Sequence, residues 1–258
     1  MNSQINKYIK KENLTHELSI AKKAAIKAGA MLKENRANNK KVIFSSSKDL
    51  KLDVDIEAEN IIKDIILNNS SLPILAEESG MTDSVMGEIY WVVDPLDGTA
   101  NYHRDIPISC VAIALMNKLE PILGVIYDFN NNELYEGSVN TKAYLNEKEI
   151  FVSNTKKSNE GILLTGLPND TDYSDNALIE MVKNFQKWRK IRMIGSAAIA
   201  SIYVASGKAD LYIEKKSYLW DVAAGAAIIN AAGGEAIISN LNEKFQVDVH
   251  FSNSEIEI

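Results

Sequence analysis

Acidic side chains gather in four short segments of the sequence, each beside a run of apolar residues. Residues 91–99 read Trp-Val-Val-Asp-Pro-Leu-Asp-Gly-Thr, so Asp94 follows an apolar run and Asp97 adds a second carboxylate three residues later. Pro95 lacks a backbone donor and Gly98 permits unusual dihedral angles, so we expect a turn that aims both carboxylates and a main-chain carbonyl at one point. Hard divalent cations such as Mg²⁺ prefer oxygen ligands of this kind. The alternative interpretation is a surface turn in which the two acids cap backbone groups.

The other three acidic segments are less informative one by one. Glu77 and Glu78 follow the apolar run 73–76, and since neighbouring strand residues point to opposite sides, only one of the two can face a given site. By themselves they are typical of a solvated loop. Asp221 precedes a run of small apolar residues, where it either interacts with a helix dipole or joins a metal cluster. Asp55 lies at a predicted helix start, where it is equally explained as a cap.

Taken together, these segments resemble the inositol monophosphatase family of magnesium-dependent, lithium-sensitive phosphatases, which includes bisphosphate nucleotidases and fructose-1,6-bisphosphatases. The resemblance extends from about residue 21 to residue 238 and rests on segments 77–79, 94–99, 195–198, 220–225 and 233–234. It implies an α+β or α/β layered sandwich of the sugar-phosphatase type, in which layers of helix and sheet alternate.

The resemblance also implies roles for individual residues. Two or three Mg²⁺ ions would be held by Glu77, Asp94, Asp97, Asp221 and the main-chain carbonyl of Leu96. Asp55 and Thr99 would activate a water that Glu77 also orients, so the catalytic residues would be Asp55, Glu77 and Thr99. The substrate would contact Asp97, Gly98, Thr99, Ser196, Ala197, Glu214 and Asp221. Clustered carboxylates repel one another and have raised pKa values without cations, so such a site needs metal before it attracts phosphate.

The implied activity is hydrolysis of a small polyol or sugar monophosphate, of the inositol-1-phosphate type, by direct attack of metal-activated water. Glu214 lies where inositol-type members carry a hydroxyl-binding glutamate, and carboxylates accept hydrogen bonds from vicinal hydroxyls; the rival interpretation is a surface charge. Lys215, Lys216 and Tyr218 match no one subfamily, and contact with a second phosphate is open to them. 3′(2′),5′-Bisphosphate nucleotides, fructose-1,6-bisphosphate and histidinol phosphate therefore stay open as substrates.

Three rival interpretations concern other classes of protein. The segment Asp53–Asp55 has the D-x-D spacing of haloacid-dehalogenase phosphatases, which form an aspartyl-phosphate, but residues 48–52 predict a poor strand before it. Gly207 and Lys208 lack the upstream glycine of a nucleotide-binding P-loop. A catalytically inactive regulatory homologue is the third, and the presence of every metal ligand expected from the family argues against it.

The amino-acid composition limits which binding partners and which cellular compartment we expect for this protein. The 258 residues include 35 acids and 28 bases, a formal net charge of −7, which argues against a nucleic-acid partner because such proteins present a basic face. Cys110 is the only cysteine and the three histidines lack a zinc-binding spacing. We see no signal-peptide core and no apolar run near the roughly 18 residues of a membrane span. We therefore expect a cytoplasmic protein with a small phosphorylated substrate and no membrane partner. The resemblance also implies that the protein is a homodimer.

The elements that must position these residues follow from hydrophobic periodicity. We expect helices at 15–35, capped by Thr15, and at 55–67, 176–187, 197–205 and 220–232. Strands are expected at 73–76, 90–93, 110–116, 122–129, 133–136, 162–164, 191–194, 209–213 and 235–238, with a hairpin turn at 130–132. The polar stretch 153–160 predicts a boundary between an N-terminal α+β subdomain (1–152) that carries most metal ligands and a C-terminal α/β subdomain (153–258).

Overall fold

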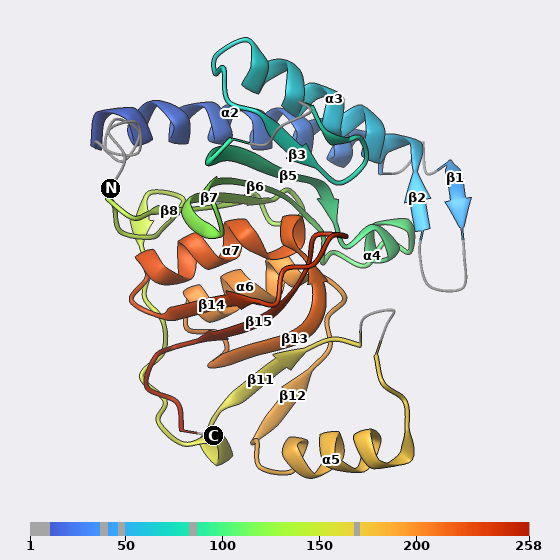
Figure 1. Cartoon of the computed structure of the whole chain (residues 1–258), viewed down its shortest axis with the longest axis vertical. Coiled ribbons are helices and arrows are strands. Elements are labelled where there is room, and N and C mark those ends of the chain that lie inside the picture. The colour runs from blue at the N-terminus through green and yellow to red at the C-terminus, as the bar shows by residue number, and fades with distance from the viewer. Residues whose placement is uncertain (1–10, 37–40, 46–49, 83–86, 168–170, 258) are drawn as a thin grey trace.

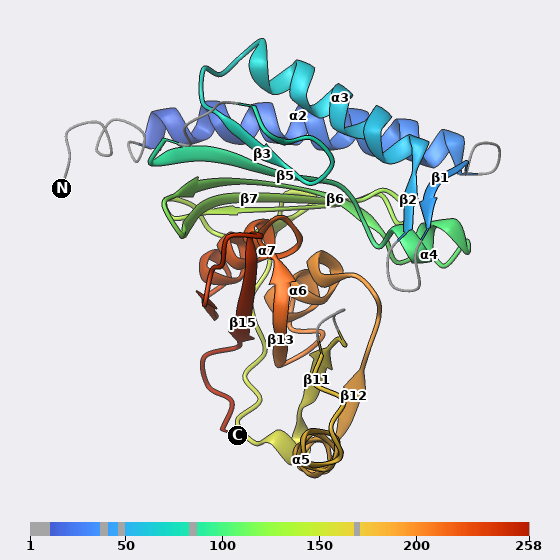
Figure 2. The same ribbon diagram turned by 45° about the vertical axis from the view of Figure 1, so that its right-hand side comes forward.

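Helices and sheets alternate in layers in the computed structural model, which describes residues 11–36, 41–45, 50–82, 87–167 and 171–257 (Figures 1 and 2). Helices α2 (Lys11–Asn35) and α3 (Asp53–Leu67) form the first layer, and a large mixed sheet lies beneath them. Helices α6 (Ala197–Ala205) and α7 (Leu219–Ala231) separate this first sheet from a second one. The layered α+β sandwich expected from the sequence is therefore confirmed.

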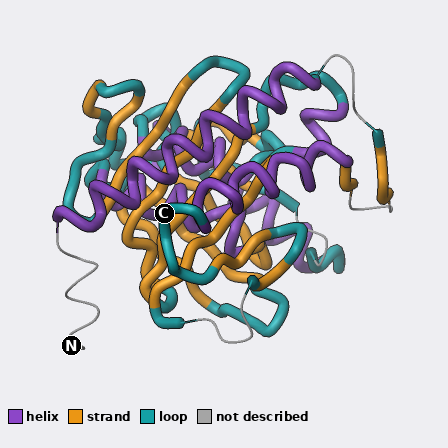
Figure 3. The backbone as a smooth tube through the Cα atoms, turned by 90° about the horizontal axis from the view of Figure 1, so that it is seen from above, coloured by secondary structure: helices purple, strands orange, loops and turns teal. Residues whose placement is uncertain are grey.

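The two outer helices bury the stripes that the sequence predicts. On α2 the alanines at 21, 25 and 28 and Leu32 are fully buried, and the helix packs on β6 and β7. The predicted start at Thr15 is wrong, because the buried Leu14 extends the apolar stripe and the helix begins at Lys11. Seen from above, α2 and α3 run across the strands of the sheet that they cover (Figure 3).

The first sheet has, in the described residues, the strand order β10-β9-β8-β7-β6-β5-β3-β4. Only β3 and β5 in it run parallel to each other. Its strands are β3 (Ile74–Ala76), β4 (Gly80–Met81), β5 (Ile89–Asp97), β6 (Cys110–Asn117), β7 (Glu120–Asp128), β8 (Glu133–Ser138), β9 (Tyr144–Leu145) and β10 (Lys148–Glu149). Strand β5 is buried along its whole length, since α3 and α7 cover its two faces.

Asp94 does not end its strand, contrary to the expectation from Pro95. Strand β5 pairs with β6 again beyond Asp94. Asp94 pairs with Ala112 and Asp97 pairs with Cys110, so three steps along β5 match only two steps along β6. One extra residue on β5 makes this a bulge, a position that tolerates proline because the ladder is already interrupted. The turn comes later, at Gly98, whose φ of +84° favours glycine. A bulge redirects side chains, which matters for the site below.

The second sheet has the order β12-β11-β13-β15-β14 in the described residues. Strand β11 runs parallel to β12 and β13, and the other pairs are antiparallel. The elements of this half are β11 (Ile162–Thr165), α5 (Asp175–Phe185), β12 (Lys190–Arg192), β13 (Leu211–Tyr218), β14 (Glu235–Ser239) and β15 (Gln246–Ser252). Strand β12 begins and ends earlier than expected, β13 extends five residues past the expected 213, and β15 was not predicted.

Short elements complete the described chain: β1 (Val42–Ser45), β2 (Leu50–Leu52), α4 (Thr99–His103) and η1 (Ser158–Glu160). The segment before Asp53 forms β2, which pairs with β1 outside both large sheets; residues 48 and 49 of the predicted poor strand lie outside the described residues. The subdomain boundary stays a prediction, since α7 from the second half packs on β5, β6 and β7 of the first. No helix among the described residues is long and apolar enough to cross a membrane.

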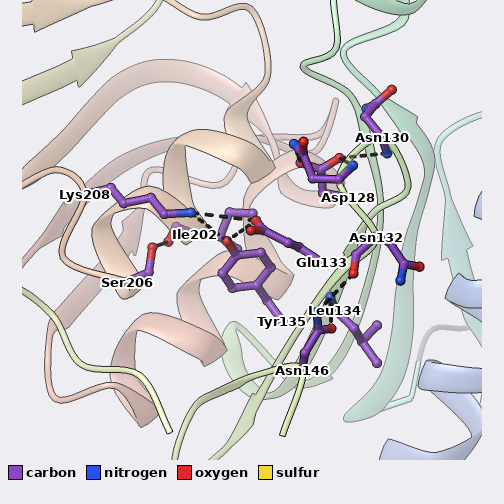
Figure 4. A network of polar contacts seen from close by, with 11 residues as sticks. Asp128, Asn130, Asn132, Glu133, Leu134, Tyr135, Asn146, Ile202, Ser206 and Lys208 are labelled. Carbon is purple, nitrogen blue, oxygen red and sulfur yellow. Dashed lines mark hydrogen bonds and ion pairs between the residues drawn. The ribbon is translucent and has the colours of Figure 1, made fainter. Parts of the chain in front are cut away.

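A polar network joins the first sheet to the loop after α6 (Figure 4). The ammonium group of Lys208 donates to the hydroxyl of Tyr135 at 2.9 Å and lies 3.7 Å from the carboxylate of Glu133, both on β8. It also lies over the rings of Tyr135 and Tyr203, at 5.6 Å and 5.2 Å. Lys208 thus ties two layers together, which explains the Gly-Lys pair without a nucleotide.

Candidate metal and phosphate site

Four predicted ligands come from three elements that meet at one end of the first sheet. Asp94 and Asp97 lie on β5, Glu77 follows β3, and Asp221 lies in the first turn of α7. Because β3 and β5 are parallel neighbours, with the N–H of Glu77 donating to the carbonyl of Val93 at 3.2 Å, the Glu77 and Asp94 side chains come side by side.

The carboxyl groups in this cluster interact strongly. The Glu77 and Asp94 side chains lie close enough for each to influence the pKa of the other. Burial, together with the charge of Glu78, raises the pKa of Glu77 to about 8. Burial and then the neighbouring acids Glu77 and Asp97 raise the pKa of Asp94 well above its ordinary value. Burial and the same neighbours raise the pKa of Asp221. Ionising these carboxyl groups costs free energy, because they are buried and repel one another, and a bound cation would offset that cost.

Asp97 connects the cluster to the second half of the chain. One of its oxygens, Oδ2, accepts hydrogen bonds from the hydroxyl of Ser196 and, at 2.8 Å, from the N–H of Ala198, at the start of α6. Ser196 also caps that helix by accepting the N–H of Ile199 at 3.2 Å. Burial raises the pKa of Asp97, and these donors oppose the rise. The predicted contacts of Ser196 and Ala197 with substrate therefore lie directly beside a predicted metal ligand.

Asp55 and Thr99, the predicted water-activating pair, bond to different partners in the described structure. Asp55 accepts the N–H of Leu52 at 2.7 Å through Oδ2, so the capping interpretation is confirmed for that oxygen. Its Oδ1 is buried and has no hydrogen-bond partner among the described residues, and burial raises its pKa to about 7. The hydroxyl of Thr99 donates at 3.0 Å to the carbonyl of Leu96, the predicted main-chain metal ligand.

A cavity of about 260 Å³ opens beside the acid cluster, between the two halves of the chain. Its walls include the predicted site residues Asp97, Ser196, Ala197, Glu214 and Asp221. Sequence reasoning missed Thr165, Gly166 and Tyr212, which also line it. The signal was present: Thr165 ends β11, and β11 runs parallel to β13, which carries Glu214, so the corresponding ends of these strands meet at one edge.

Among the described residues, Glu214 is the single carboxylate that the second sheet contributes to this cavity. The hydroxyl of Tyr212 donates to its Oε2 at 3.0 Å, and burial raises its pKa. Gly166 faces it so closely that a Cβ at that position would collide with the carboxylate. Lys215 and Lys216 are exposed and are not among the described residues that line the cavity. The surface-charge interpretation of Glu214 is therefore wrong.

Asn101 is a second residue that sequence reasoning missed. Its side-chain amide donates to the carbonyls of Ile108, Ile194 and Gly195 at 2.9, 2.8 and 3.1 Å. Ile194 and Gly195 belong to the wall of the cavity, whereas Asn101 lies on α4, two residues after Thr99, a predicted substrate contact. No carboxylate or histidine marks this contact, so only the spatial neighbours reveal it.

The donor set fits a hard divalent cation. Within the described residues no three Asp, Glu, His or Cys side chains already surround one point as metal ligands. The groups that meet are nevertheless all oxygen donors: the carboxyl groups of Glu77, Asp94, Asp97 and Asp221. The raised pKa values of Glu77, Asp94 and Asp221 are what a cation-binding cluster displays when protons take the place of the cation.

Comparison with known proteins decides the family. The model of the inositol monophosphatase family matches residues 13–253, nearly the whole chain. The chain belongs to the inositol monophosphatase family. A relative from Synechocystis, named inositol-1-monophosphatase, is 37% identical over 224 residues, which cover 84% of this chain and 77% of that protein. A relative from Xylella fastidiosa, named Nus factor SuhB, is 40% identical over 221 residues, which cover 84% of this chain and 80% of that protein.

Solved structures of this family agree with the fold. An inositol monophosphatase from Anabaena (Nostoc) superposes with a TM-score of 0.81 at 32% sequence identity, covering 94% of this chain and 92% of that one. An inositol monophosphatase from Thermotoga maritima superposes with a TM-score of 0.77 at 28% identity, covering 92% and 91%. The layered arrangement that brings the acid cluster and the cavity together is therefore the arrangement of the inositol monophosphatase fold.

Proposed function

We propose that this chain is a Mg²⁺-dependent phosphomonoesterase that hydrolyses a small polyol or sugar monophosphate, of the inositol-1-phosphate type, by direct attack of water. The observation that carries the proposal is the cluster of Glu77, Asp94, Asp97 and Asp221, of which Asp97 and Asp221 line a cavity of about 260 Å³. Relatives named inositol-1-monophosphatase and fructose-1,6-bisphosphatase/inositol-1-monophosphatase support it.

The chain's own residues divide the work between them. Glu77, Asp94, Asp97, Asp221 and the carbonyl of Leu96 would hold two or three Mg²⁺ ions, which when bound supply Lewis-acid activation of water and phosphate. The backbone amides of Gly98 and Thr99 would hold phosphate oxygens. Asp55 has a buried oxygen without a partner among the described residues and a pKa near 7, which suits a group that takes a proton from water near neutral pH.

Substrate selection falls to the cavity. Ser196 and Ala197 line it beside the acid cluster, and Glu214 faces them from the second sheet. A buried carboxylate accepts hydrogen bonds from two adjacent hydroxyl groups, so Glu214 favours a polyol. Bisphosphate nucleotides, fructose-1,6-bisphosphate and histidinol phosphate are the competing substrates on the same scaffold. Lys215 and Lys216, which would have met a second phosphate, are exposed, and this favours a monophosphate.

The competing function is that of an inactive regulatory homologue, and relatives named Nus factor SuhB are the observation that favours it. A catalytically inactive homologue could lose these carboxylates by substitution, yet every predicted metal ligand is present in this sequence. Homodimer formation and a cytoplasmic location stay predictions.

A substrate screen tests the proposal. Phosphate release is measured from inositol-1-phosphate, adenosine 3′,5′-bisphosphate, fructose-1,6-bisphosphate and histidinol phosphate, each with Mg²⁺ and with added Li⁺. We expect the highest kcat/KM with inositol-1-phosphate, inhibition by Li⁺, and no trapped phospho-enzyme. Release from none of the four would overturn the proposal in favour of the regulatory homologue. A trapped aspartyl-phosphate would favour the haloacid-dehalogenase interpretation.

A further inference from the structure

Helix α3 carries three charged residues along one line of its surface. Asp55, Glu59 and Lys63 are spaced by four, and residues with that spacing lie one above the other on an α-helix. Glu59 is only 2% exposed, although nothing in the site described above uses its carboxylate. A buried carboxylate needs partners that offset its lost hydration. The partners of Glu59 therefore indicate its role.

One partner of Glu59 lies in the turn that joins β3 to β4, and the other is Lys63 on the same helix. Glu59 accepts the backbone N–H of Glu78 at 2.8 Å through Oε2. Lys63, one helical turn further on, donates to the hydroxyl of Ser79 at 2.8 Å. An ion pair of 3.7 Å joins Glu59 and Lys63 along the helix. The two side chains thus hold two successive residues of the turn, directly after Glu77.

The side chain of Glu78 is held separately. The ammonium group of Lys51 donates to its Oε2 at 2.9 Å, and this side chain is only 8% exposed. The Glu77 side chain has a different neighbour, the carboxyl group of Asp94 on β5. The direction of Glu77 is therefore fixed by contacts to its neighbours and not by contacts of its own side chain alone.

We propose that Glu59 is a positioning residue for the cation site: by holding the amide of Glu78 it fixes the peptide that begins at Glu77 and keeps the Glu77 carboxylate beside Asp94. The inference rests on the proposed function, in which Glu77 holds cations. Hydrogen bonds behind a ligating group orient it, and their removal lowers metal affinity by roughly 10- to 100-fold. Asp55 and Glu59 then serve one site from a single face of α3, the first through its proposed role in activating water and the second through the turn.

A purely structural role for Glu59 makes a different prediction. Its loss would then lower the melting temperature without a specific effect on cation binding. Ile62 is a matched control, because it lies on the same helix, is fully buried, and contacts the hydrophobic core rather than the turn. Glu59→Gln is the conservative variant, since its amide oxygen still accepts the N–H of Glu78.

The test titrates the metal-free protein with Mn²⁺ alone, an oxygen-preferring divalent probe whose free concentration is read by electron paramagnetic resonance. We expect Glu59→Ala to weaken Mn²⁺ binding by roughly 10- to 100-fold. Glu59→Gln should recover most of that loss, and Ile62→Val should lower the melting temperature while leaving Mn²⁺ affinity within about twofold of wild type. In turnover assays, Glu59→Ala should raise the Mg²⁺ concentration needed for half-maximal activity by a larger factor than the factor by which it lowers kcat at saturating Mg²⁺.

Mn²⁺ affinity of Glu59→Ala within twofold of wild type would overturn the inference. Equal weakening in Ile62→Val at the same loss of melting temperature would overturn it too. If Glu59→Ala does not fold, Glu59→Asp takes its place, because its carboxylate is one methylene too short to reach the turn. Unchanged Mn²⁺ affinity in Glu59→Asp would likewise overturn the inference. Failure of the proposed function is distinguishable, because the wild-type protein itself would then bind no Mn²⁺.

Discussion

The two sides of the cavity differ in how their carboxylates are arranged. On the side of the first sheet, Glu77, Asp94 and Asp97 crowd together, and their raised pKa values record mutual repulsion as well as burial. On the side of the second sheet, Glu214 stands apart and accepts a hydrogen bond from Tyr212. Crowded acids are suited to cations, and a single satisfied acid is suited to hydroxyl groups. Under the proposed function, the first side would govern whether reaction occurs, and the second would govern which substrate reacts.

The largest expected effect is that of Asp94→Asn, on the crowded side. The amide keeps the size and the hydrogen-bonding capacity of the protonated acid but carries no charge for a cation, so we expect kcat to fall by roughly 1000-fold or more. The melting temperature of the metal-free protein should not fall. Phosphate release and thermal unfolding measure the two effects.

Asp210→Asn is the matched control, since Asp210 is also buried but accepts the N–H of Ile162 outside the acid cluster. Its turnover at saturating Mg²⁺ should stay close to that of the wild type. Hydrolysis at the wild-type rate by Asp94→Asn would contradict the division of labour between the two sides.

Glu214→Gln should have a smaller and selective effect. A hydrogen bond to a charged group is worth about 1.5–3 kcal/mol, so kcat/KM for a polyol monophosphate should fall roughly 10- to 100-fold. The loss for adenosine 3′,5′-bisphosphate should be smaller. Kinetics of both substrates with the same enzyme preparation give the ratio, and Lys215→Gln, on the exposed residue next to it, should leave that ratio unchanged. Equal losses for the two substrates would mean that Glu214 does not select.

The smallest expected effect is on stability as a function of pH. The pKa of Glu77 is raised from 4.5 to about 8 and that of Asp55 from 3.8 to about 7 in the folded protein. The folded state then binds more protons than the unfolded state between about pH 4 and pH 8, so stability is lost as pH rises through that window. The metal-free protein should melt on the order of 10 °C lower at pH 8.5 than at pH 5.5.

Scanning calorimetry in the presence of a chelator measures this difference. Added Mg²⁺ should raise the melting temperature more at pH 8.5 than at pH 5.5, because cations replace protons in the cluster. A metal-free protein that is more stable at the higher pH would show that the acids are not crowded as described.

Sequence reasoning succeeded where the signal is local. The stripe on α2, the buried strands of the first sheet and the range of α6 follow from apolar periodicity within one segment. The acid segments identified the cluster because each acid lies near the end of a strand or in the first turn of a helix. The alternation expected for Glu77 and Glu78 does not apply, because residues 77–79 form a turn rather than a strand.

Features that depend on distant partners escaped prediction. The bulge at Pro95 exists because β6 pairs with β5 on both sides of it, and a register is not visible in one strand. The contact of Asp97 with Ala198 joins residues 101 positions apart. Glu59 looks like any helical glutamate until the β3–β4 turn is brought against it. In each case a residue's role is set by packing between segments, and sequence spacing does not encode it.

Dependence on a divalent cation is the central claim, and one assay tests it most directly. Phosphate release from inositol-1-phosphate is measured with protein freed of metal by a chelator, before and after Mg²⁺ is restored. We expect turnover only after Mg²⁺ is added, with a Mg²⁺ requirement that Asp94→Asn cannot satisfy at any concentration. Equal phosphate release with and without Mg²⁺ would contradict the account.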